Sequence, residues 1–173
     1  MKRPVLVVAL LFVAVAAVAA EPSNEITAAN VLRLMNEYRA EEGLLPLNED
    51  VLLDLAAGDR MRHMEEESFW SHESPNGLSP FHWLSQRDYR YRTAGENLAT
   101  GFETANVLVQ SWMESRGHRA NILSPNYEDC GIAIIDGSTL GRSTGKSIVV
   151  MFGSKRVETM PIIVRVTDKP TQP

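Results

Sequence analysis

The most distinctive part of the sequence is the pair of stretches Ser111-Trp112-Met113-Glu114-Ser115 and Gly117-His118-Arg119-Ala120-Asn121-Ile122-Leu123. Upstream of them stand Gly95-Glu96-Asn97-Leu98-Ala99 and, further back, Trp70-Ser71-His72. Two of the four histidines, His72 and His118, therefore lie in or beside turn-forming sequence. Because loops on a rigid scaffold carry side chains into clefts, these two are the strongest candidates for a functional site.

Apolar residues at helical spacing predict three helices around these stretches. The first, capped by Thr27 and ended by Gly43 and Pro46, is predicted by the stripe Ala28, Val31, Leu32, Met35 and Tyr38. The second, with Asn48 as its cap, is predicted by Leu53, Ala57, Met61 and Met64. The third is predicted by Ala105, Leu108, Val109 and Trp112.

Between the second and third helices, residues 68–101 are rich in prolines, glycines and aromatic residues. This composition predicts long loops around one short helix near residues 80–87, and such long loops are usually functional. Alternating or β-branched residues then predict strands at 130–134, 148–152 and 162–166, with residues 137–146 as the loop between the first two. The pattern favours one α+β domain without internal repeats.

Residues 1–20 have the pattern of a secretory signal peptide. Lys2 and Arg3 precede an apolar run from Val5 to Ala20 that closes on small residues. A retained membrane anchor is the alternative, but a spanning helix needs about 18 to 20 apolar residues, slightly more than this run offers. We expect a secreted or extracytoplasmic protein with a signal peptide at 1–20, a linker at 21–27, one domain at 28–167 and a tail at 168–173. No membrane span is expected after signal removal.

Charge and cysteine content exclude several classes of protein. The formal net charge is −5, and removal of Lys2 and Arg3 makes it more negative. Nucleic-acid binders need clustered lysines and arginines, so we expect no nucleic-acid partner. Cys130 is the only cysteine, which excludes an internal disulfide and a four-cysteine zinc site. Its alternation with Ile132 and Ile134 predicts a small buried apolar residue.

Together with Asn36-Glu37-Tyr38-Arg39 and Gly43-Leu44-Leu45-Pro46-Leu47, the stretches above form six motifs in a fixed order. The sequence resembles the CAP superfamily, which unites cysteine-rich secretory proteins, antigen 5 and plant pathogenesis-related proteins. The resemblance runs from about Val31 to Gly153 and is strongest to the disulfide-free bacterial branch called SCP-like extracellular.

This resemblance implies an α-β-α sandwich, with a small antiparallel sheet between helical layers, and a central cavity lined by two histidines and two acids. Motif by motif, the cavity residues are His72, Glu96, His118 and, as the second acid, Glu114. In disulfide-rich members that acid stands three places after the helix tryptophan, where this chain has Ser115. One residue on a helix is about 100° of rotation. Whether Glu114 or Ser115 faces the cavity is therefore left open.

The chemistry of this set suits a divalent metal. Neutral imidazoles bind zinc, and carboxylates complete the shell or hold an imidazole in its ligating tautomer. The resemblance implies zinc or another divalent cation, weakly bound to His72 and His118, with the acids hydrogen-bonding around them. The same residues also suit a polar network that only ties loops to the core.

Other polar residues are expected to be structural. His63 and His82 are interpreted as solvated or edge positions of helices. Ser71 is not a candidate nucleophile, because adjacent residues on an extended chain point apart and no Gly-x-Ser-x-Gly elbow occurs. Asn36 and Arg39, one helical turn apart, are expected to lock a loop to the first helix.

We interpret the chain as a secreted binding module whose ligand is a small molecule or lipid, or an extracellular protein. Some relatives bind sterols or fatty acids in apolar pockets, yet Trp70 and its aromatic neighbours are expected mostly in the core. The alternative is a metal-dependent hydrolase acting on peptides or cell-envelope material, with Glu96 or Glu114 as general base. No recognised catalytic signature supports it. A third reading is an inactive cavity beside loops that bind a protein.

Overall fold

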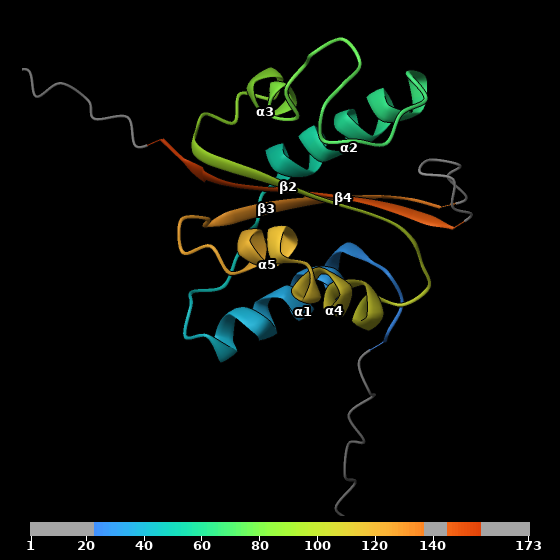
Figure 1. Ribbon diagram of the computed structural model, residues 1–173. Coiled ribbons are helices and arrows are strands. Elements are labelled where there is room, and N and C mark those ends of the chain that lie inside the picture. Colours follow the sequence, from blue (N-terminus) through green and yellow to red (C-terminus); the bar gives the residue numbers. More distant parts are fainter. Residues whose placement is uncertain (1–22, 137–144, 157–173) are drawn as a thin grey trace, which may run out of the picture.

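A computed structural model of the chain describes residues 23–136 and 145–156. The helices are α1 (Ala28–Glu41), α2 (Val51–Glu66), α3 (His82–Gln86), α4 (Ala105–Glu114) and α5 (Arg116–Ile122). The strands are β1 (Asn48–Glu49), β2 (Tyr91–Phe102), β3 (Asp129–Ile135) and β4 (Lys146–Lys155). Figure 1 follows this order along the chain.

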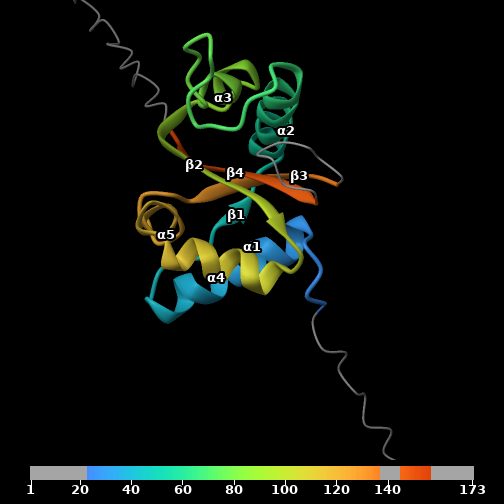
Figure 2. The same ribbon diagram turned by 45° about the vertical axis from the view of Figure 1, so that its right-hand side comes forward.

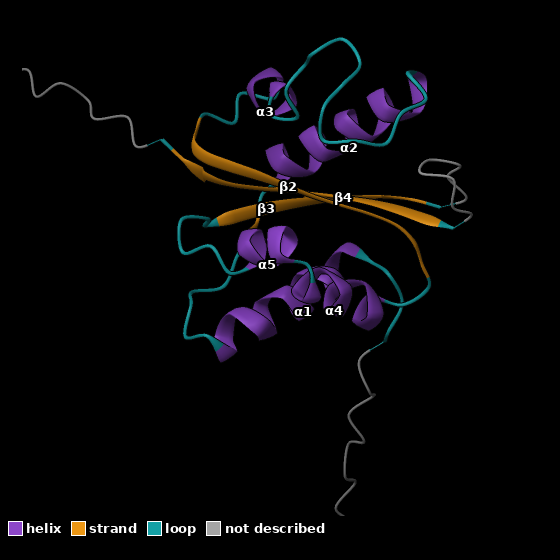
Figure 3. Cartoon of the chain, viewed as in Figure 1, coloured by secondary structure: helices purple, strands orange, loops and turns teal. Residues whose placement is uncertain are grey.

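The elements form three layers, as expected. Helices α1, α4 and α5 cover one face of the sheet, and α2 and α3 cover the other (Figure 1). Turning the molecule by 45° keeps the layers apart (Figure 2). Figure 3 shows the long loop that joins α2 to α3, which lies on the same side of the sheet as these two helices. This α-β-α sandwich confirms the predicted fold class.

The sheet has the order β1-β3-β4-β2. Strand β4 is antiparallel to both β2 and β3, whereas the short β1 runs parallel to β3. Because side chains alternate along a strand, β4 contributes apolar side chains to a hydrophobic core on each face of the sheet. Ile148, Val150 and Phe152 join the core beneath α1 and α4, while Val149 and Met151 join the core beneath α2.

The predicted helices are confirmed, with one correction at a cap. Thr27 caps α1 by accepting a hydrogen bond from the backbone amide of Asn30 at 3.2 Å. The predicted cap of α2, Asn48, is wrong, because Asn48 pairs with β3 as part of β1. Asp50 caps α2 instead, with its carboxylate accepting from the amides of the next turn. Aspartate and asparagine cap helices about equally well, so the sequence alone does not show whether Asn48 or Asp50 is the cap.

The prediction of loops up to residue 101 is wrong for its last part, where β2 forms. Gly95 resembles a turn residue, yet it lies inside the strand, paired with Phe152. A Cβ there would come within 2.5 Å of the Tyr127 hydroxyl and 3.0 Å of Asn121 Oδ1. The glycine therefore marks a close approach to the next layer, not a turn.

Two further expectations concern the last third of the chain. The predicted third helix is α4, which ends at Glu114, and the extended backbone at Ser115 (φ −89°, ψ 120°) separates it from α5. The strand predicted at 162–166 and most of the loop predicted at 137–146 lie outside the described residues. Within the described ranges, no helix combines the length and the apolar character that crossing a membrane would require.

The predicted structural residues hold the loops as expected. Arg39 is buried and donates to the backbone carbonyls of Leu45, Ile122 and Ser124 at 2.7 to 2.9 Å. Asn36 both donates to and accepts from the backbone of Leu47. Cys130 is fully buried in the core. Partly buried aromatic residues pack against the core beneath α2, namely Phe69, Trp70, Phe81, Trp83 and Tyr91.

Candidate functional site

His72 and Glu96 are in direct contact. His72 lies in the loop after α2, and its Nδ1 is 2.7 Å from Oε1 of Glu96 on β2. The Glu96 side chain is 2% exposed and that of His72 is 55% exposed. This bond raises the pKa of His72 above its ordinary 6.5, an effect that partial burial of the ring opposes. Nε2 of His72 has no hydrogen bond to any described residue, and so stays available to a ligand.

The carboxylate of Glu96 is itself fixed by Arg60 on α2. Arg60 Nε donates to Oε2 of Glu96 at 2.9 Å, and both side chains are buried. The remaining guanidinium nitrogens donate to the hydroxyl of Ser74 at 2.9 Å and to the carbonyls of Ser71 and His72 at 2.6 and 3.0 Å. One buried side chain thus positions both the carboxylate and the loop that carries His72.

Strand alternation explains why Glu96 meets Arg60. Glu96 and Leu98 share one face of β2, and Leu98 belongs to the core beneath α2. Asn97 points to the other face, where its amide donates to the carbonyl of His118 at 3.2 Å. Because β2 is one of the two edge strands of the sheet that the described residues form, groups from both helical layers can meet at its edge.

His118 reaches this edge from α5, which asparagines tie to β2. Asn121 donates to Oδ1 of Asn97 at 2.8 Å and to the carbonyl of Glu96 at 3.0 Å. Burial lowers the pKa of His118 below its ordinary 6.5, and the nearby positive charge of His72 lowers it further. Both effects favour the neutral form of the His118 ring.

The structure places Glu114 away from this group. The side chain is exposed near the end of α4 and accepts a hydrogen bond from Gln110 on the same helix at 3.1 Å. No hydrogen bond or ion pair joins Glu114 or Ser115 to His72, Glu96 or His118 in the described part of the chain. The hydrogen bonds therefore join Glu96 to His72 directly, and they tie His118 to Asn97, the next residue of β2, through its backbone carbonyl.

The pairing of His72 with Glu96 suits a divalent metal, but the surrounding residues that the structure describes add no further ligand. A ligating imidazole usually gives its other nitrogen to a carboxylate, which is the arrangement of His72 with Glu96. Across residues 23–136 and 145–156, no three His, Cys, Asp or Glu side chains are grouped so as to hold a metal ion together. A cation on His72 and His118 would take its other ligands from solvent, which fits weak binding.

Sequence reasoning missed Arg60 and misjudged His63. Arg60 stands four residues before Met64 and three after Ala57, so it falls within the buried stripe of α2. A charged residue at such a position signals a buried, partnered group. The interpretation of His63 as solvated or at an edge is wrong, since it is 8% exposed. Its ring packs against those of Phe69 and Trp83. His82 is half-buried, which agrees with an edge position.

The sequence model of the Cysteine-rich secretory protein family, CAP, matches residues 32–152. The chain belongs to this CAP family.

Two Bacillus subtilis proteins are similar in sequence. The chain is 36% identical over 110 residues to the uncharacterized protein YkwD and 29% identical over 104 residues to the uncharacterized membrane protein YlbC. These matches cover 64% and 60% of the chain, but only 43% and 30% of the relatives. The chain therefore spans less than half the length of either.

Solved structures share the fold at lower identity. An outer surface protein from Borrelia burgdorferi superposes with a TM-score of 0.66 at 20% identity, covering 78% of this chain and 98% of that one. An extracellular protein with an SCP domain from Bacillus anthracis gives 0.60 at 24% identity, covering 77% and 45%. A cysteine-rich secretory protein from Staphylococcus aureus gives 0.57 at 20% identity, covering 73% and 38%.

Proposed function

We propose that the chain is an extracellular binding module that holds a divalent cation such as zinc weakly on His72 and His118. The observation that carries this proposal is the 2.7 Å bond between His72 Nδ1 and Glu96 Oε1. With a proton on Nδ1, the neutral ring keeps a lone pair on Nε2 for a metal. Burial of His118 favours its neutral form, which is also the ligating form.

When bound, the cation would supply open coordination positions for oxygen or nitrogen atoms of a ligand. The chain's own residues orient the site. Arg60 and Glu96 keep the His72 ring in place, and Asn97 and Asn121 hold the start of α5 against β2. Only two protein ligands contribute, so we expect exchangeable binding.

The hydrogen bonds of Glu96 and the exposure of Glu114 favour a binding function over hydrolysis. Both oxygens of Glu96 are engaged, one by His72 and one by Arg60, and the side chain is buried. A general base needs an oxygen within reach of the attacking water. Glu114, the other candidate, is turned to solvent beside Gln110. Cleavage of a peptide or peptidoglycan by the zinc-loaded protein, abolished by Glu96→Gln in a folded variant, would overturn this assignment.

The extracellular location rests on two observations. Residues 1–20 have the charge and apolar pattern of a signal peptide. Structures with the same fold come from an outer surface protein and an extracellular protein. The partner of the module belongs to the same environment, as a small molecule, a lipid or another protein.

Calorimetric titration with zinc tests the metal site. His72→Ala and His118→Ala should each remove most of the binding, whereas His82→Ala, a half-buried histidine on α3, should leave it unchanged. Because the pKa of His72 is raised, zinc affinity should begin to fall at a pH above the ordinary 6.5 of histidine. Equal zinc affinity in the three variants would contradict the proposal.

A further inference from the structure

A cavity at one end of the sheet, independent of the metal proposal, gathers three arginines. It lies where β2 begins and β4 ends, two segments that run side by side close to α3 (Figure 1). Its volume is about 520 Å³, which is within the usual range for small-molecule sites. Its walls are formed by Arg90, Arg92 and Arg156, together with Ser85, Asp88, Tyr89 and Tyr91.

The pairing of β2 with β4 brings these arginines together. Tyr91 is opposite Lys155 in the antiparallel ladder, and the backbone amide of Arg156 donates to the carbonyl of Arg90 at 2.8 Å. Arg90 and Arg156 are therefore neighbours across the ladder. Arg92 is the extra residue of a β-bulge that follows Tyr91. A bulge turns a side chain out of the normal alternation, and Arg92 lines the same cavity as the other two arginines.

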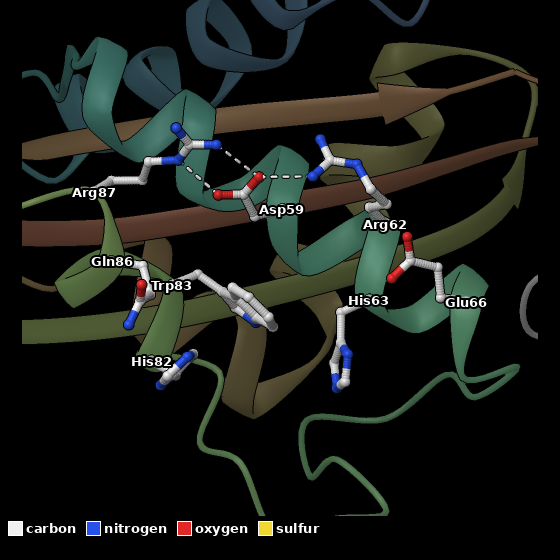
Figure 4. Close-up of a pocket in the computed structure, with 8 residues that line it drawn as sticks. All are labelled: Asp59, Arg62, His63, Glu66, His82, Trp83, Gln86 and Arg87. Carbon is white, nitrogen blue, oxygen red and sulfur yellow. Dashed lines mark hydrogen bonds and ion pairs between the residues drawn. The ribbon is translucent and has the colours of Figure 1, made fainter.

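Other arginines of this acidic chain are closely matched by carboxylates. Asp59 accepts from Arg87 at 2.6 and 2.8 Å and from Arg62 at 3.0 Å, and Figure 4 shows both guanidinium groups turned toward it. Glu96 binds Arg60 at 2.9 Å in the same manner. In such pairs a carboxylate of the chain already neutralises the positive charge.

The walls of the cavity have a different balance of charge. Asp88 is the one acid that lines the cavity in the described part of the chain, against three arginines, which leaves a charge of +2. Glu128 lies 3.8 Å from Arg92, which is beyond the distance of a hydrogen bond. Like charges on neighbouring strands repel each other, so an anion between Arg90 and Arg156 would relieve an unfavourable contact.

The donors of these walls suit a phosphate group. The planar guanidinium matches two phosphate oxygens at once, and a phosphate monoester carries a charge between about −1.5 and −2 at pH 7, which would balance the walls. The Ser85 hydroxyl adds a donor, and the half-buried ring of Tyr91 adds apolar surface. We propose that this cavity binds a small soluble phosphate monoester, whose phosphate lies between Arg90, Arg92 and Arg156.

Titration of the full chain with glycerol 3-phosphate, followed by ¹H–¹⁵N NMR, tests the proposal. The backbone amide signals of Arg90, Arg92 and Arg156 should move and saturate with a single affinity. Acetate, which carries one charge, should bind at least about tenfold more weakly, because it engages fewer of the charged donors. Unmoved amide signals, or acetate that binds as tightly as the phosphate ester, would overturn the proposal.

Arginine variants separate this cavity from a general attraction of anions. Arg92→Gln and Arg156→Gln should each weaken glycerol 3-phosphate at least about fivefold, and both side chains are exposed, so the variants should fold. Arg62→Gln is the matched control, since it removes the same charge from an exposed side chain on α2. Its affinity should change less than about twofold, because salt screens distant exposed charges. Equal losses of affinity in the three variants would overturn the proposal.

Vesicles of phosphatidylcholine with phosphatidic acid present the same phosphate group on a membrane. Basic clusters that hold proteins on membranes usually contain about four to eight lysines or arginines, more than the three here. The protein should therefore stay in solution when such vesicles are sedimented. Cosedimentation that Arg156→Gln abolishes, without any binding of glycerol 3-phosphate, would overturn the soluble ligand in favour of a lipid headgroup.

Discussion

Arg60 and Glu96 form an ion pair inside the protein, with 2.9 Å between Nε and Oε2 and side chains that are 0% and 2% exposed. Removing one member of such a pair leaves an uncompensated charge in a medium that solvates it poorly. The pair also bonds to His72 through the carboxylate and to the His72 loop through the guanidinium. The stability of the fold and the geometry of the site therefore depend on the same two residues.

Arg60→Met should lower the free energy of unfolding by about 3 to 5 kcal/mol, because the carboxylate of Glu96 stays buried without its partner. Urea unfolding measures this loss. Arg62→Met is the matched control, since Arg62 lies in the same helix with a side chain that is 62% exposed. Its loss should be at most about 1 kcal/mol. Similar losses of unfolding free energy in the two variants would show that the buried ion pair stabilises the fold no more than an exposed arginine does.

Titration of the two histidines should separate them. Glu96 raises the pKa of His72 above 6.5, while burial lowers that of His118 below 6.5. The His72 contribution to stability is fully present below pH 6.5 and is lost as pH rises through the folded pKa. His118 acts in the opposite sense, since stability falls as pH drops from 6.5 through its folded pKa.

Histidine Cε1–H shifts followed by NMR measure both values. In Glu96→Gln the pKa of His72 should fall, because the hydrogen bond to a carboxylate is the largest cause of its shift. His118 is the internal reference, since burial is the main cause of its lowered pKa. An unchanged His72 titration in this variant would rule out Glu96 as the partner.

Gly95→Ala should destabilise the chain by about 1 to 3 kcal/mol, the usual cost of overpacking. Its Cβ would meet the Tyr127 hydroxyl at 2.5 Å, and that hydroxyl donates to the carbonyl of Ala94 at 3.0 Å. Gly117→Ala is the control, because no atom lies within 4 Å of a Cβ at that helical position. Thermal unfolding compares the two. Equal midpoints of thermal unfolding would mean that β2 and Tyr127 move apart at no cost in stability.

Exported protein should begin near Glu21 and lack the apolar run at its start. The run from Val5 to Ala20 ends in small residues, which is where signal peptidases cut. Intact-mass measurement of extracellular material identifies the first residue. A full-length species found only in the membrane fraction would contradict the signal-peptide interpretation.

Local pattern accounts for what could be predicted from the chain alone. The stripe of α2 and the cap of α1 depend on residues three or four positions apart, so the printed order of residues is enough to find them. The six ordered motifs identify the family in the same way, because each motif is a short run of neighbouring residues. His72, Glu96 and His118 enter as candidates through these motifs.

The tertiary structure decided what depends on distant contacts. Strand β2 forms because β4 supplies its hydrogen bonds and Tyr127 takes the space beside Gly95, 32 residues further along the chain. Arg60 is buried because Glu96, which lies 36 residues away, neutralises it. Glu114 is exposed because it is the last residue of α4 and bonds back to Gln110 of that helix, whereas the backbone of His118, beyond the break at Ser115, bonds to Asn97 on β2. Burial and pairing are properties of the packed chain, whereas periodicity belongs to the sequence itself.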